Sequence, residues 1–110
     1  MIDDTVRKIE ARIENAAALK SDHKTEMLAL LATLKSEIAV ISHTHSEEAQ
    51  SIAGFTEIST HEATRLQKNP ALLKLSIEGL SSSARGFEQS HPKLVEIVNA
   101  ICVTLSSLGI

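Results

Sequence analysis

Apolar residues recur at alternating steps of four and three through residues 27–41, and this spacing constrains the fold more than any other feature. The seam consists of Met27, Leu31, Leu34, Ile38 and Ile41. A step that averages 3.5 residues keeps apolar side chains on one side of an α-helix, as in coiled coils. The spacing therefore predicts a helix from about Asp22 to Ser42 that packs lengthwise against other helices.

The same alternation returns in the C-terminal part of the chain. One seam comprises Leu73, Ile77, Leu80, Ala84 and Phe87, and a second comprises Leu94, Val98, Ile101, Leu105 and Leu108. Asn69 and Pro70 suit the N-cap and first position of a helix, which is predicted to run from 70 to 89. Because His91 precedes Pro92 but also continues the seam, the next helix either follows a break or extends the first as one kinked helix. Gly109 and Ile110 have the form of a Schellman ending.

Two further helices are predicted, and together the segments define the fold class. An apolar stripe from Ile2 to Ala16 predicts a helix over about 3–19. A stripe of mostly small residues predicts another over about 46–68, with Phe55 and Ile58 to one side. Thr44 and Glu47 have the spacing of a capping box at its start. We therefore expect a single all-α domain over 1–110, an antiparallel helical hairpin or coiled-coil bundle of four to five helices. Its two long arms have candidate kinks near 42–46 and 90–92. Straight arms would give a rod and bent arms a compact bundle, and both geometries fit the pattern.

Composition and charge argue against several classes of function. Aromatic residues make up 2% of the chain, and basic residues alternate with acidic ones at a net charge of −3. We therefore expect no nucleic-acid partner. The acidic start and the polar residues in every apolar stretch predict a cytoplasmic protein without a membrane interaction. Phosphate loops, nucleophile elbows and paired cysteines are absent from the sequence. We accordingly expect no enzyme and no cofactor, and we expect the single Cys102 to be a buried packing residue.

Histidines near the two breaks offer one local alternative. If the chain folds back at Asn69, the break at 42–46 and the break at 90–92 lie at the same level of the hairpin. His43, His45 and His91 would then gather near Glu88, as ligands for a transition metal or as a pH-responsive hinge. The competing interpretation is that these histidines are solvated residues at helix ends. A second pair, Glu57 and His61, has the spacing to share one face of a helix, and we expect it to be solvated.

Short motifs spread along the chain resemble those of a small bacterial family that is known only as a domain of unknown function. The motifs are EEAQSIAGF at 47–55, HEATR at 61–65, EGL at 78–80, FEQSHP at 87–92 and LSSLGI at 105–110. The resemblance extends over essentially the whole chain. It implies no known activity, substrate or catalytic residue.

The leading functional hypothesis is a helical interaction module that forms a homodimer or receives a helix of another protein. The chain has more apolar seams than one thin hairpin can bury, so part of each seam is expected to face a second chain. The predicted interface residues are Leu31, Leu34, Ile38, Ile77, Leu80, Phe87, Val98, Ile101 and Leu105. The alternative hypothesis is the metal- or pH-responsive protein that uses His43, His45 and His91.

Overall fold

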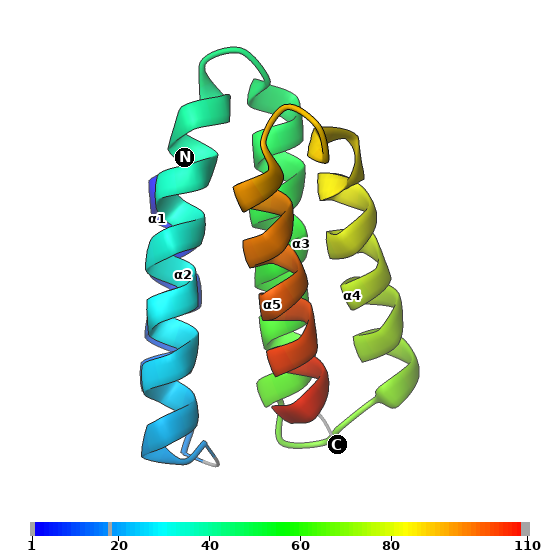
Figure 1. The fold of residues 1–110 in the computed structure, drawn as a ribbon. Coiled ribbons are helices and arrows are strands. Elements are labelled where there is room, and N and C mark those ends of the chain that lie inside the picture. Colours follow the sequence, from blue (N-terminus) through cyan, green and yellow to red (C-terminus); the bar gives the residue numbers. More distant parts are fainter. Residues whose placement is uncertain (1, 18, 109–110) are drawn as a thin grey trace.

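The chain folds into an up-and-down bundle of helices, seen in a computed structural model that describes residues 2–17 and 19–108 (Figure 1). The described residues form α1 (Ile2–Glu14), α2 (Ser21–Ser42), α3 (Ser46–Thr64), α4 (Pro70–Ala84), the 3-10 turn η1 (Arg85–Phe87) and α5 (Pro92–Leu108), with no strand. The dimensions of 37 × 24 × 22 Å are those of a compact bundle. The all-α fold class is as predicted. Of the two geometries left open by the sequence, a rod and a compact bundle, the chain adopts the bundle.

Consecutive helices run antiparallel, so the turns alternate between the two ends of the bundle (Figure 1). The turn at 43–45 and the segment at 88–91 lie at one end, whereas the turn at 65–69 lies at the other. α3 packs against α4 and α1, and α5 packs against α2 and α4. The two sequence breaks are therefore at the same end, as the hairpin argument predicted. The alternative of one kinked helix through His91 is wrong, because the chain reverses direction between α4 and α5.

The helix ends depart from the expected capping in places. Asn69 is the N-cap of α4 as predicted, and its Oδ1 accepts a hydrogen bond from Leu72 N at 3.2 Å. The predicted capping box of α3 is wrong. The N-cap of α3 is His45 rather than Thr44, and its side chain makes no capping hydrogen bond. The Thr44 hydroxyl instead shares a 2.8 Å hydrogen bond with the imidazole of His45.

Three helices end before their predicted limits. α4 ends at Ala84 rather than at 89, and the 3-10 turn η1 follows it. α1 ends at Glu14 rather than near residue 19, and the carbonyl of Glu14 accepts a 3.1 Å hydrogen bond from Lys24 Nζ of α2. α3 ends at Thr64 rather than near Lys68, whose ammonium instead donates to the carbonyl of Ala63. Leu66 falls within the predicted helix but follows the end of α3, and it is 96% exposed. The predicted Schellman ending at 109–110 lies outside the described residues.

The interior is built from the predicted seams. Every seam residue of α2 is buried, and so are Leu94, Val98, Ile101 and Leu105 of α5. Ile9 and Ile13 of α1 complete one continuous hydrophobic interior with them, and Val6 of the same helix is also buried. Burial of each large aliphatic side chain contributes roughly 1.5–3 kcal/mol of hydrophobic free energy. The bundle is therefore stabilised chiefly by aliphatic packing between its own helices.

The helix α3 also buries several hydroxyl side chains, which it satisfies locally. Thr56 and Ser59 are fully buried, and each donates a 2.7 Å hydrogen bond to the carbonyl four residues earlier. Thr60 is equally buried, but its Oγ1 has no hydrogen-bond partner. Small hydroxyl residues let neighbouring helices approach α3 closely while most of the polar atoms stay paired.

Candidate functional site

The predicted interface residues lie in the core of the single chain. Ile77 is partly buried against the core, and the other eight are buried within it: Leu31, Leu34, Ile38, Leu80, Phe87, Val98, Ile101 and Leu105. The eight buried side chains are therefore covered by their own chain, because the bundle turns its seams toward one another instead of forming a thin hairpin. Any interface has to use side chains that the bundle leaves outside.

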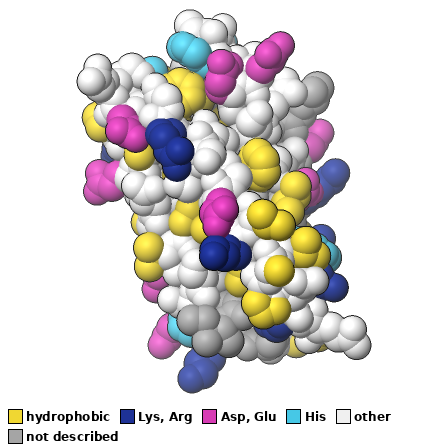
Figure 2. Space-filling model, turned by 90° about the vertical axis from the view of Figure 1, so that its right-hand side faces the viewer, with side chains coloured by type: hydrophobic (Ala, Val, Ile, Leu, Met, Phe, Trp, Pro, Cys, Tyr) yellow, Lys and Arg dark blue, Asp and Glu magenta, His cyan; other side chains and the backbone are white. Residues whose placement is uncertain are grey.

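A different set of apolar side chains remains exposed on neighbouring helices. Phe55 and Ile58 of α3 are 36% and 49% exposed, and Leu72 and Leu75 of α4 are 42% and 63% exposed. We call these four residues the α3–α4 face. Figure 2 looks onto the α4 side of the bundle and shows hydrophobic side chains gathered there into a patch. Isolated exposed aliphatic residues are common, whereas a patch spanning two helices is typical of an interaction surface.

Close packing of α3 on α4 makes this face continuous. The Phe55 ring lies over Gly79, where a Cβ would stand 2.9 Å from Cζ of the ring and closer still to its neighbours. Leu72 and Leu75 precede Gly79 by seven and four residues, so they share its side of α4. α3 and α4 run antiparallel (Figure 1), so a residue after Phe55 on α3 is level with a residue before Gly79 on α4. Ile58 follows Phe55 by about one turn, which makes it level with Leu75. The α3–α4 face thus forms a single strip across both helices.

Two residues of opposite charge border the α3–α4 face where α4 turns toward α5. Lys74 and Glu78 are exposed, stand four residues apart on α4, and line a groove with Leu73, Ile77 and Ser106 of α5. They therefore flank the α3–α4 face on the side toward α5. In the described part of the chain neither side chain takes part in an ion pair.

A second charge pair is already satisfied within the chain. Arg65 Nη1 lies 2.9 Å from Oε1 of the buried Glu62, near the start of the turn between α3 and α4. His61, predicted to accompany Glu57, instead has Nε2 3.9 Å from Glu62 Oε2. The charges of this end of α3 are thus directed at one another.

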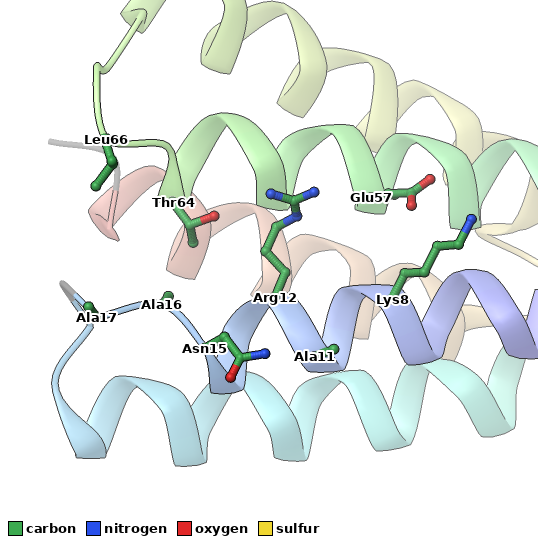
Figure 3. Close-up of a pocket in the computed structure, with 9 residues that line it drawn as sticks. All are labelled: Lys8, Ala11, Arg12, Asn15, Ala16, Ala17, Glu57, Thr64 and Leu66. Carbon is green, nitrogen blue, oxygen red and sulfur yellow. The ribbon is translucent and has the colours of Figure 1, made fainter.

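Glu57 faces α1 instead. It lines a groove between α1 and α3 together with Lys8, Arg12, Asn15 and Thr64 (Figure 3). Lys8 and Arg12 extend from α1 toward α3 in this view. For the residues that the structure describes, no ion pair joins either cation to Glu57. The groove is a surface of mixed charge.

Only two of the three hinge histidines come together. The Phe87 ring lies between them, with its centroid 5.3 Å from that of His45 and 5.6 Å from that of His91, both edge-on. His43 lines a separate groove with Ile2, Asp3 and Lys35, and Glu88 is exposed. Over residues 2–17 and 19–108, no group of three or more His, Cys, Asp and Glu is placed to hold a metal ion. The geometry gives this cluster a packing role at the end of the bundle.

Cys102 packs between α5 and α4, as expected. It is 9% exposed, and its thiol lies 3.9 Å from the carbonyl oxygen of Ile77. Desolvation by burial raises the pKa of the Cys102 thiol. The reactive thiolate is therefore disfavoured at neutral pH.

Comparison with known proteins places the chain within a family of undefined role. A family model described as a domain of unknown function (DUF4404) matches residues 27–110, from the second turn of α2 to the C-terminal residue. The match confirms the resemblance noted in the sequence, although α1 lies outside it. Neither the curated proteins nor the solved structures that were searched gave a match. None of the described helices combines the length and the apolar character that crossing a membrane requires.

Proposed function

We propose that this chain, which belongs to the DUF4404 family of domains of unknown function, is a self-association module that pairs with a second copy of itself through the α3–α4 face. The observation that carries the proposal is the exposure of Phe55, Ile58, Leu72 and Leu75 on one continuous strip. Covering such a strip removes apolar surface from water, which favours association.

The charges beside the strip favour a second copy as the partner. A basic or an acidic partner would be attracted by one of Lys74 and Glu78 and repelled by the other. A two-fold related copy presents the same two residues in reverse order, so that each charge can meet its opposite. The chain is thereby complementary to itself on both the apolar and the charged side of the surface.

The test is molar mass in solution, measured by light scattering on a sizing column over a range of loading concentrations. The wild-type chain is expected near twice 11.9 kDa at high concentration and to approach 11.9 kDa on dilution. Leu75→Asp places a carboxylate in the middle of the strip and should give a monomer at every concentration. Far-ultraviolet circular dichroism establishes that this variant keeps its helices.

Val103 provides a matched control, because it is also a large apolar residue, 68% exposed, but lies on α5. Val103→Asp should dimerise like the wild-type chain. A wild-type chain that elutes at 11.9 kDa at all concentrations refutes self-association, and the face would then be open to a different protein. Equal loss of dimer in both variants would place the interface elsewhere.

A further inference from the structure

The positions of Lys74 and Glu78 define how two copies would meet. We infer that the dimer is antiparallel, with its two-fold axis passing between the two copies of α4 at the level of Ser76, and that Lys74 of each copy pairs with Glu78 of the other. The inference rests on the self-association proposed above and adds its register. The register follows from the spacing of four side chains along α4 and from the contact between Gly79 and Phe55.

The charged side sets the level of the axis. Lys74 and Glu78 each lie two residues from Ser76. When two antiparallel helices are related by a two-fold axis at Ser76, Lys74 of one copy stands at the height of Glu78 of the other. The two side chains share one flank of α4, and a perpendicular two-fold axis keeps this flank on the same side of the interface in both copies. Two equivalent ion pairs result, both across the interface.

The apolar side fits the same axis. Leu72 stands within about 1.5 Å, the rise of one residue, of the height of Gly79 in the other copy. Gly79 has no side chain there, and the half-exposed Phe55 ring covers it, which leaves a flat apolar platform for the incoming leucine. Leu75 and Ile58 lie next to the axis, so both copies contribute them to the centre of the interface. Ion pairs and apolar contacts therefore agree on one register.

Charge reversal tests the register directly. Lys74→Glu should weaken the dimer, since it places an acidic residue opposite Glu78 at each of the two contacts. Glu78→Lys should weaken it by placing a lysine opposite Lys74 at each contact. Two attractive contacts become repulsive in each variant, so the dissociation constant is expected to rise roughly tenfold at low salt. The loss should diminish at high salt because the pairs are exposed.

Mixing the two variants separates contacts between chains from contacts within a chain. An equimolar mixture of Lys74→Glu and Glu78→Lys chains pairs acid with base at both positions, so it should form heterodimers about as tightly as the wild-type chain. A like-charge pair within each chain would persist in the mixture and would not be relieved. The doubly reversed chain, Lys74→Glu with Glu78→Lys, should likewise dimerise normally. Sedimentation equilibrium measures the dissociation constants of the two single variants, of their mixture and of the doubly reversed chain, and each is compared with that of the wild-type chain.

The possible results distinguish a failure of this register from a failure of self-association. A wild-type dimer whose affinity is unchanged in both single variants, or a mixture no tighter than either variant alone, rejects this register and leaves self-association standing. A wild-type monomer rejects both proposals. Recovery of affinity in the mixture, together with loss in each variant alone, establishes the antiparallel pairing.

Discussion

The ring of Phe55 lies directly against the backbone of Gly79, and this contact joins α3 to α4 at the middle of the exposed apolar strip. A Cβ at position 79 would overlap the edge of the ring. Gly79 is thus required by a close approach, even though glycine within a helix costs about 1 kcal/mol relative to alanine. Gly54, on the next helix, has open space where a Cβ would be added. These two glycines form a natural pair for experiment.

Gly79→Ala is expected to destabilise the chain. The added methyl group must displace the Phe55 ring, and such overpacking costs about 1–3 kcal/mol, which outweighs the gain in helix propensity. Gly54→Ala meets no neighbour and should instead raise the free energy of unfolding by up to about 1 kcal/mol. Urea denaturation followed by circular dichroism measures both. A stabilised Gly79→Ala chain would contradict the tight contact.

Thr60→Val should leave stability unchanged or increase it. The Thr60 hydroxyl is buried without a partner, so its replacement by a methyl group removes an unsatisfied polar atom and keeps the side-chain shape. Thr56→Val is the control, because the Thr56 hydroxyl donates a 2.7 Å hydrogen bond to Ile52 O. Losing that bond costs on the order of 1 kcal/mol before the benefit of burying a methyl group is added. Thermal melts should therefore rank Thr60→Val above Thr56→Val.

Leu34→Ala should unfold the chain rather than merely dissociate it. Leu34 is 1% exposed inside the core, and deletion of such a leucine typically costs 2–5 kcal/mol, which we expect here. The midpoint of urea unfolding should fall markedly for Leu34→Ala. Leu75→Ala, on the exposed strip, should keep the unfolding transition of the monomer and lose only dimer affinity. If Leu34→Ala dissociated the chain while leaving its unfolding unchanged, the residue would belong to an interface after all.

Cys102 should make stability fall at alkaline pH. Burial raises the pKa of its thiol in the folded chain, so the unfolded chain loses the proton first as the pH increases. The contribution of the neutral thiol is complete below the ordinary pKa of an unfolded thiol and is lost as the pH rises toward the raised folded value. The difference in unfolding free energy between the wild-type chain and Cys102→Ala should change over this alkaline range. A difference that is independent of pH there would contradict the desolvation of the thiol.

The sequence contains a signal for the candidate site, because its four apolar residues lie outside the periodic stripes of their helices. Phe55 and Ile58 fall outside the apolar stripe of their helix, and Leu72 and Leu75 fall outside the seam that contains Leu73 and Leu80. Apolar residues away from the main stripe are candidates for a second contact. The pattern does not reveal that the two off-stripe pairs are neighbours, since that depends on how α3 packs against α4.

The sequence by itself determined the helices, the position of the cap at Asn69, the return of both breaks to one end, and the residues of the core. These features depend on local capping and on the 3.5-residue period, which a chain carries along its length. Only the tertiary structure decided what the seams face. A period identifies the apolar side of a helix but not the chain that covers it, because coverage depends on how many helices converge. Here Leu34 and Ile101 are covered by their own chain, whereas Leu75 is left exposed.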